Sequence, residues 1–229
     1  MFKKGDFHIH SSFSDGALSP TEIVKLAKFR EIDILALTDH NNMDGIDEAI
    51  KTGEEYGIKV IPGVEVSTRF RNTKVHILGY FKGEDYKDEL LEEVLIKIKL
   101  HKAQWIYEVF KDKFDFHGYK DRLYVETGIE LLKFFGATVI LAHPILLPKE
   151  DFHIIKRMDF HGIEAKYFSN TEEDTRSFIS FAKANNLLYT AGSDFHAPTE
   201  MYRAHGLLGD VYLDENEIKD FLLRSRLFH

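Results

Sequence analysis

The sequence predicts an α/β protein built from strands and helices that alternate around a parallel sheet. Short apolar runs of strand length alternate with amphipathic helical stretches, which is typical of βα units. Histidines and carboxylates recur where these apolar runs end, as they do in proteins with a site at one end of such a sheet. A chain of 229 residues with 44% hydrophobic residues can bury one large core. We therefore expect one domain with a barrel or a wound sheet.

Local signals predict the first elements. Residues 6–10 have the length and pattern of a first strand. Ser19 and Glu22 form a capping box with Pro20 at the first helical position, so we expect a helix to begin there. Residues 34–38 then predict a second, buried strand.

A second helix is predicted over residues 44–56, where Gly57 can end it. Turn signals at Gly63 and at residues 69–73 then separate three further extended segments. These segments are residues 59–61, 64–68 and 74–80.

The pattern changes between residues 85 and 135, where long helical periodicity replaces the strand signal. We interpret this stretch as a helical insertion within a single domain of residues 1–229. The alternation then resumes, with helices predicted over residues 170–185 and from residue 214 onwards. The strands of this second half are predicted at residues 137–142, 162–166 and 187–191.

Composition excludes several classes of protein. The chain has no cysteine, which excludes disulfides, thiolate zinc sites and iron–sulfur clusters and leaves nitrogen and oxygen ligands for any metal. The sequence has no signal-peptide pattern and no apolar stretch long enough to span a bilayer, so we expect a cytoplasmic protein without a membrane partner. The formal charge of −8 disfavours duplex DNA and favours a small substrate or a nucleic-acid end.

Residue types that bind divalent metals follow the predicted strands. His8 and His10 lie two residues apart on a strand, so both imidazoles point to one side and can reach one ion. Asp194 and His196 follow another strand, on the face where parallel βα proteins build their active sites. Glu65 can bridge two ions because a carboxylate has two oxygens. The candidate metal ligands are His8, His10, Asp15, His40, Glu65, His76, His143, Asp194 and His196.

Some polar positions have a second interpretation. His76 lies between Val75 and Ile77, an alternation that also fits a strand with one solvated face. Asp39 can orient His40 without binding metal itself. Five other histidines have no partner at ligand spacing, and we interpret them as surface or core residues: His101, His117, His153, His161 and His229.

In order along the chain, these residues resemble the motifs of the PHP family, named after polymerase and histidinol phosphatase. The matching segments are Asp6-Phe7-His8-Ile9-His10, Ser14-Asp15-Gly16, Leu37-Thr38-Asp39-His40, Pro62-Gly63-Val64-Glu65-Val66-Ser67, Ala142-His143-Pro144 and Ser193-Asp194-Phe195-His196. The resemblance covers nearly the whole chain apart from the helical insertion. It implies a distorted seven-stranded (β/α)7 barrel of the TIM type that binds two or three divalent ions.

The resemblance also implies how the ligands divide among the ions. One ion would be bound by His8, His10, Glu65 and Asp194. A second would be bound by Glu65, His76 and His143, and a third by Asp15, His40 and His196. Imidazole and carboxylate suit zinc, manganese and iron alike, so the identity of the metal stays open.

A centre of this composition predicts a metal-dependent phosphoesterase. A hydroxide bridging the ions linked by Glu65 would attack phosphorus in line, with Asp194 and His196 as further catalytic positions. Residues 15–20 and 62–65 most resemble PHP phosphoesterases that act on 3′,5′-bisphosphonucleotides and on the 5′ ends of short RNA. The alternatives are a phosphatase of the histidinol-phosphate type, an amidohydrolase-like enzyme with a non-phosphate substrate, and a binding module that only retains the fold.

Basic residues near the candidate ligands predict a second contact with phosphate, for which arginine has the suitable bidentate geometry. These residues are Arg69, Arg71, Lys74 and Arg203, and ordinary solvated charges are the alternative for each. His205 could protonate a leaving alkoxide, or it could be an ordinary loop histidine. After Glu164 the relatives often carry a histidine that this chain replaces with Ala165-Lys166-Tyr167-Phe168-Ser169-Asn170, which leaves the substrate open.

Overall fold

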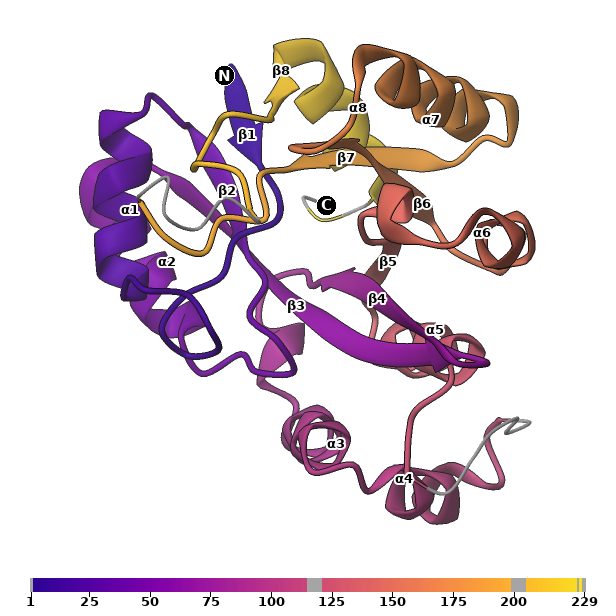
Figure 1. Cartoon of the computed structure of the whole chain (residues 1–229). Helices are drawn as coiled ribbons and strands as arrows, with labels where there is room; N and C mark the ends of the chain where they lie inside the picture. The colour runs from indigo at the N-terminus through magenta and orange to yellow at the C-terminus, as the bar shows by residue number, and fades with distance from the viewer. Residues whose placement is uncertain (1, 115–120, 199–204, 226, 228–229) are drawn as a thin grey trace.

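The computed structural model of the protein describes residues 2–114, 121–198, 205–225 and 227. Its strands form one sheet in the order β7-β6-β5-β4-β3-β2-β1-β8 (Figure 1). The strands are β1 (Lys4–Asp6), β2 (Ile34–Leu37), β3 (Lys59–Phe70), β4 (Thr73–Tyr80), β5 (Thr138–Leu141), β6 (Gly162–Tyr167), β7 (Leu188–Gly192) and β8 (Leu213–Asp214). The helices are α1 (Pro20–Phe29), α2 (Ile46–Tyr56), α3 (Glu89–Lys99), α4 (Ala103–Phe110), α5 (Val125–Phe134), α6 (Lys149–Ile155), α7 (Glu172–Ala184) and α8 (Glu215–Ser225), with 3₁₀ turns η1 (Asp85–Lys87) and η2 (Pro144–Leu146).

The sheet closes into a ring just after β1. Ile9 forms a parallel bridge with Phe195, and the backbone N–H of Phe7 donates to the carbonyl of Ala191 at 2.9 Å. The predicted strand over residues 6–10 is therefore split: Lys4–Asp6 pairs with β2 and β8, and the extended residues that follow pair with the end of β7. The expected α/β barrel is confirmed, and the two-residue β8 adds an eighth strand beside the predicted seven.

The ring is not parallel throughout, because β4 runs antiparallel to both β3 and β5. The predicted segments 59–61 and 64–68 are also not separate, since they join into the twelve-residue strand β3. Gly63 lies inside this strand and pairs with Tyr80, so the predicted turn at Gly63 is wrong. Apolar alternation reports which residues are buried, but it does not encode the direction of the neighbouring strand.

Capping signals in the sequence place the helix ends correctly. The Ser19 side chain accepts from the backbone N–H of Glu22, and the Glu22 carboxylate accepts from the N–H of Ser19, which forms the predicted capping box of α1. Gly57 ends α2 in the left-handed region with φ of 70°. These two helices pack side by side outside the first strands (Figure 1).

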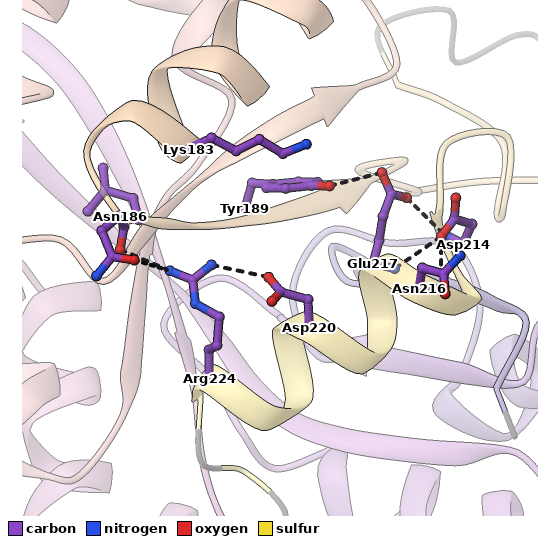
Figure 2. A pocket seen from close by; sticks show the side chains of 9 residues that line it. Lys183, Asn186, Tyr189, Asp214, Asn216, Glu217, Asp220 and Arg224 are labelled. Carbon is purple, nitrogen blue, oxygen red and sulfur yellow. Dashed lines mark hydrogen bonds and ion pairs between the residues drawn. The ribbon is translucent and has the colours of Figure 1, made fainter.

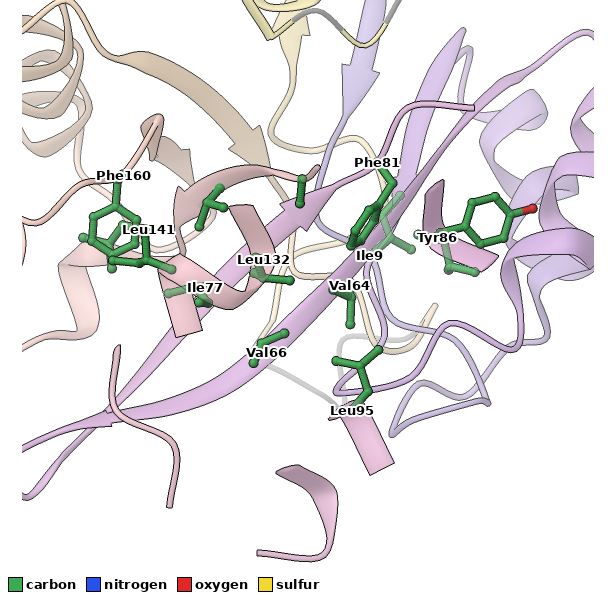
Figure 3. Packing of buried hydrophobic residues seen from close by; sticks show 14 of the residues in the cluster. Ile9, Val64, Val66, Ile77, Phe81, Tyr86, Leu95, Leu132, Leu141 and Phe160 are labelled. Atoms are coloured by element: carbon green, nitrogen blue, oxygen red, sulfur yellow. The ribbon is translucent and has the colours of Figure 1, made fainter. Parts of the chain in front are cut away.

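The core has two layers, one on each side of the strand ring. The outer layer joins strands to helices and includes Ile9, Val64, Ile77, Leu95 and Leu132 (Figure 3). Each fully buried side chain of this size contributes roughly 1.5–3 kcal/mol through burial. Ile9 therefore points outwards between the two inward-facing histidines, as the two-residue strand period predicts.

Inside the ring, the aromatic rings of Phe7 and Tyr80 pack against Phe221 of α8 at centroid distances of 5.0 and 5.7 Å. The Tyr80 hydroxyl donates to the carbonyl of Phe7 at 2.7 Å, which satisfies its polar group inside the core. Helix α8 thus packs against the apolar interior of the barrel, and the polar interior lies towards the opposite end.

The described part of the stretch between residues 85 and 135 contains η1, α3, α4 and α5. It packs on the barrel wall, because α3 contacts β3 and α5 contacts β3, β4 and β5. Leu95 of α3 and Leu132 of α5 belong to the outer core layer (Figure 3). Among the described residues, no helix combines the length and apolar character needed to cross a bilayer.

Candidate metal centre

The nine predicted ligands converge at one end of the ring. His8, His10, His40, His143, Asp194 and His196 follow the carboxyl ends of parallel strands, Asp15 lies in the loop before α1, and Glu65 and His76 lie within β3 and β4. They surround a hollow of about 400 Å³, which we call the histidine cavity. Its lining residues are Asp15, His40, Glu65, Lys74, His76, His143, Leu146, Leu147, Tyr167, Asp194, His196 and His205, with His8 and His10 fully buried beneath them.

His76 reaches the cavity because β4 is antiparallel. The beginning of β4 lies at the end of the ring where the parallel strands finish, and His76 pairs there with Ser67. Val75 and Ile77 are fully buried in the outer core layer, and His76 is only 8% exposed. The face of β4 that carries His76 is therefore the inner wall of the cavity and not a solvated face.

The Glu65 carboxylate, 1% exposed, is surrounded by imidazoles on both oxygens. Its Oε1 lies 2.8, 3.0 and 3.4 Å from ring nitrogens of His76, His143 and His8. Its Oε2 lies 2.9 and 3.3 Å from ring nitrogens of His40 and His10. A carboxylate whose oxygens face two different groups of imidazoles has the geometry to bridge two cations.

Two further carboxylates complete the centre. Asp194 Oδ1 lies 3.2 Å from His10 Nε2 and 3.4 Å from His8 Nε2. Asp15 Oδ1 lies 3.2 Å from His196 Nε2, and its Oδ2 lies 3.7 Å from His40 Nε2. Four groups of residues could each hold a metal ion, because the ligand atoms within each group lie within 4.8 Å of one another. The groups are His10, Asp15, His40 and His196; His8, His10 and Asp194; His40, Glu65 and His76; and Asp194, His196 and His205. Three of these groups overlap the three ligand groups that the family resemblance implies.

The residues of the cavity fit divalent metal ions. Among the described residues, His76 Nε2 and His143 Nδ1 are buried without a hydrogen-bond partner. His8 Nε2 and His10 Nε2 lie 3.1 Å apart in a fully buried position. Buried nitrogens without partners are costly, and convergent imidazole and carboxylate groups are the usual ligands of zinc, manganese and iron.

Electrostatics keeps Glu65, Asp194 and His76 in the protonation states that metal binding requires, whereas the pKa of His10, which burial lowers, is raised to about 9 by Asp194 and Glu65. Burial raises the pKa of Glu65, but the imidazoles of His76, His8 and His40 outweigh burial and hold that pKa well below its usual range. Burial also raises the pKa of Asp194, but neighbouring imidazoles, His8 first among them, outweigh burial and hold that pKa well below its usual range. Burial lowers the pKa of His76 to about 4 although Glu65 opposes it. The carboxylates are ionised and His76 is neutral near pH 7, so both can bind a cation without first losing a proton.

Two of the candidate ligands have an unusual backbone. His143 has φ of 27° and Asp194 has φ of 53°, and such positive values are uncommon for residues other than glycine. Strain of this kind persists where the surrounding structure holds it, and it concentrates at functional sites.

Asp39 stabilises the loop that carries Asp15. Its carboxylate accepts from the backbone N–H of Ser11 at 2.7 Å, from the Ser11 hydroxyl at 2.6 Å and from the Ser14 hydroxyl at 2.5 Å. The contact we expected from Asp39 to His40 is replaced by these bonds to the loop. Asp39 thus supports a ligand, although a different one from the ligand that the sequence suggested.

Sequence reasoning missed two residues of the centre, Glu164 and Tyr167 on β6. The Tyr167 hydroxyl donates to Asp194 Oδ2 at 2.8 Å, and Glu164 is fully buried beside His8. The signal available for Glu164 was a lone carboxylate inside an apolar run of strand length, since a buried charge needs a partner.

His205 also lies at the centre. Its Nδ1 is 3.1 Å from Asp194 Oδ2, and its ring stacks on that of His196 at a centroid distance of 3.7 Å. The imidazole is 28% exposed, so it can meet a substrate at the mouth of the cavity.

Only some of the basic residues that were predicted to contact phosphate lie at the cavity. Lys74 lines the cavity, whereas Arg69 donates to the carbonyl of Asn72 at 3.0 Å and Arg71 lies 3.7 Å from Asp151. Arg69 lies near the end of β3 and Arg71 lies in the turn of the β3–β4 hairpin, and both are absent from the described lining of the cavity. The predictions for Arg203, His117 and His229 fall outside the described residues.

A second hollow, of about 520 Å³, differs in chemistry from the histidine cavity. We call it the α7–α8 groove, and it is lined by Lys183, Asn186, Leu187, Tyr189, Asp214, Asn216, Glu217, Asp220 and Arg224 (Figure 2). Arg224 pairs with Asp220 at 3.1 Å, and the Tyr189 hydroxyl donates to Glu217 at 3.1 Å. None of its described lining residues is a histidine, so its described part lacks the imidazole groups that characterise the histidine cavity.

Comparisons with known proteins identify the family to which the chain is related. The model of the PHP domain matches residues 6–140. A 5′-3′ exoribonuclease of Haemophilus influenzae is 28% identical over 86% of this chain and 92% of its own length. A 3′,5′-nucleoside bisphosphate phosphatase of Chromobacterium violaceum is 28% identical over 90% of this chain and 92% of its own. The crystal structure of a Bifidobacterium adolescentis protein assigned as a metal-dependent phosphoesterase has a TM-score of 0.76 at 21% identity and covers 96% of both chains.

Proposed function

The chain belongs to the PHP domain family, and we propose that it is a phosphoesterase that depends on divalent metal ions. The observation that carries this proposal is the buried Glu65 carboxylate, whose two oxygens face two different groups of imidazoles. Bound cations at such a centre lower the pKa of water and stabilise charge on a phosphoryl oxygen, which is the chemistry that phosphoester hydrolysis needs.

Nine side chains would hold two or three ions of zinc, manganese or iron. Glu65 would link two ion positions, and Asp194 and Asp15 would each anchor a group of imidazoles on either side of it. The nine ligands are His8, His10, Asp15, His40, Glu65, His76, His143, Asp194 and His196. Most of them lie on strands or directly after strands, so the centre is rigid before a substrate arrives.

The cavity wall supplies groups for the substrate. His205 contacts Asp194 and His196 on one side and is partly exposed on the other, so it can carry a proton to a leaving alkoxide. Lys74 lines the same cavity and can contact a second phosphate as a point charge. The sequence indicated both of these residues together with Arg69 and Arg71, but the described lining of the cavity contains neither arginine.

We propose that the substrate is a nucleotide phosphoester, either a 3′,5′-bisphosphonucleotide or the 5′ end of a short RNA. Two relatives that align with more than four fifths of this chain carry these activities in their names. A cavity of about 400 Å³ suits a phosphate with part of a nucleoside, and it is too small for a duplex.

The test is a hydrolysis panel with added manganese, zinc or iron, run on the native protein and on Asp194→Asn. The panel contains 3′,5′-bisphosphonucleotides, short 5′-phosphorylated RNA, histidinol phosphate and an amide substrate. We expect phosphate or nucleotide release by the native protein and a loss of at least about 10³-fold in the variant, because several kcal/mol of charge stabilisation are removed. Equal activity in both proteins, or turnover of the amide alone, would contradict the proposal.

A further inference from the structure

Glu164 is a buried charged residue that lies beside the metal centre but belongs to none of its ligand groups. It lies on β6, and its side chain is 0% exposed. An ionised carboxylate in such a place is unfavourable unless it is hydrogen-bonded. The partners of Glu164 therefore indicate what its burial supports.

Both oxygens of Glu164 contact residues of the metal centre. Oε1 lies 3.0 Å from Nδ1 of His8, and Oε2 accepts from the backbone N–H of His143 at 2.7 Å. A carboxylate can only accept, so Nδ1 of His8 carries the hydrogen. In the neutral imidazole, which is the form that binds metal, the free lone pair of His8 is then on Nε2, and Nε2 faces His10, Glu65 and Asp194.

The contact with His143 acts on the backbone. His143 has φ of 27°, a conformation outside the regions that L-residues favour. A 2.7 Å hydrogen bond from its N–H to a fixed carboxylate holds the chain in this conformation. One side chain thus connects two candidate ligands that come from different strands.

An irregularity in β6 places Tyr167 on the same face of the strand as Glu164. The β6–β7 pairing shifts register between Glu164, which is opposite Thr190, and Lys166, which is opposite Ala191. Such a bulge inserts one residue and turns the strand locally. As a result Glu164 and Tyr167 both face the centre, whereas Lys166 reaches outwards to Glu217 at 2.5 Å.

A glycine on the neighbouring strand makes room for the same contact. A Cβ atom at Gly192 would lie 2.1 Å from Glu164 Oε1 and 2.3 Å from the Cβ of His8. Both distances are too short for any side chain, so only glycine permits Glu164 and His8 to meet there. The glycine on β7 thus serves the hydrogen bond between Glu164 and His8.

We propose that Glu164 is a positioning residue of the metal centre. It fixes the tautomer of His8 so that Nε2 is free to bind metal, and it holds the strained backbone of His143 so that this imidazole faces Glu65. The inference rests on the proposed metal-dependent function. Carboxylates that orient metal-binding histidines in this way typically change metal affinity 10- to 100-fold when they are replaced.

The test is the affinity of the metal-free protein for Zn²⁺ and for Mn²⁺, measured by competition with a chelating dye. Glu164→Gln keeps the shape of the side chain, but its amide can accept from only one of the two donors. We expect binding about 10- to 100-fold weaker than in the native protein. The control is Thr190→Val, a buried substitution opposite Glu164 in the register, for which we expect an affinity within about twofold of native.

Each outcome separates this inference from the proposed function. If the native protein binds neither ion, both fail. If the native protein and Glu164→Gln bind equally, or if Thr190→Val weakens binding as much, only the positioning role fails. Nitrogen-15 NMR of the zinc-loaded native protein gives a check that needs no variant: we expect the hydrogen of His8 on Nδ1 and the metal on Nε2, and the opposite tautomer would overturn the inference.

Discussion

The histidine cavity and the α7–α8 groove are both hollows rich in charged residues, but their charges are satisfied differently. In the groove, Glu217 contacts Tyr189, and Asp220 contacts Arg224 (Figure 2). Glu217 also pairs with Lys166, which lies outside the groove lining. In the cavity, the carboxylates are shared among several imidazoles, and two buried imidazole nitrogens have no hydrogen-bond partner among the described residues.

This difference distinguishes charged residues that only stabilise the fold from charged residues that are arranged to bind a ligand. Paired charges at a partly exposed surface contribute little beyond local stability. Buried nitrogens without partners would cost stability unless something further binds them. The size of a hollow does not make this distinction, because the groove has the larger volume of the two.

The largest expected contrast is between the central carboxylates of the two hollows. We expect Glu65→Gln to lower kcat/KM by at least about 10³-fold, because a charge that would link two ions is lost. Glu217→Gln should leave kcat/KM within about twofold and cost roughly 1 kcal/mol of unfolding free energy. Kinetics on the best substrate and urea unfolding of both variants measure this contrast, and an equal loss of activity in both would remove it.

Metal removal should destabilise the native protein because ions are lost from the histidine cavity, and the α7–α8 groove should not contribute to this effect. An ion present at 100 times its Kd stabilises by about 2.7 kcal/mol, which corresponds to a rise in Tm of roughly 5–10 °C for a chain of this size. We expect this rise in the native protein and in Glu217→Gln, but not in Glu65→Gln. Calorimetry with chelator and then with excess Mn²⁺ measures it. An unchanged Tm in the native protein would argue against a metal centre.

Two glycine substitutions compare packing at the cavity with backbone strain far from it. Gly192→Ala would place a Cβ 2.1 Å from Glu164 Oε1, so we expect a loss of about 3 kcal/mol in unfolding free energy and weaker metal binding. Gly57→Ala has open space around it and φ of 70°, so the cost should be about 1–2 kcal/mol of backbone strain with metal binding unchanged. Denaturation and dye competition distinguish the two, and weaker metal binding by Gly57→Ala would contradict the local explanation.

The smallest expected effect concerns His161, a histidine outside the cavity. Burial, with a contribution from Lys133, lowers the pKa of His161, and its Nδ1 accepts from the N–H of Val139 at 2.9 Å. The unfolded chain therefore binds this proton more readily, so stability is present above the unfolded pKa of about 6.5 and is lost as pH falls through the folded pKa. His161→Asn keeps an acceptor but does not titrate, and we expect a smaller loss of stability between pH 7 and pH 5. Identical pH profiles of unfolding would contradict this role.

The sequence predicted the elements that depend on local chemistry. The capping box at Ser19 and the helix end at Gly57 occur where they were expected, because hydrogen bonds within a few residues create them. The nine candidate ligands were proposed because residues of these types stand at the ends of apolar runs in the order of a known family, and their role as ligands stays a prediction. Their convergence around Glu65 agrees with that interpretation.

Long-range geometry was not predictable in the same way. The antiparallel direction of β4 depends on the hairpin with β3, so the route by which His76 reaches the cavity was missed. Proximity in sequence also misplaced some of the basic residues that were predicted to contact phosphate, because the hairpin carries Arg69 and Arg71 towards its turn and leaves Lys74 at the cavity. The spacing of residues along one strand does not predict which residues of other segments lie beside that strand.

The sequence by itself determined the fold class and the chemical nature of the centre, since strand and helix periodicity and the supply of imidazoles and carboxylates are properties of the chain. Only the tertiary structure decided how those groups divide around Glu65 and which residues support them. Glu164 on β6 shows the reason: its role depends on a glycine on β7 and a backbone N–H after β5, which lie far apart in sequence and meet only when the ring of strands closes.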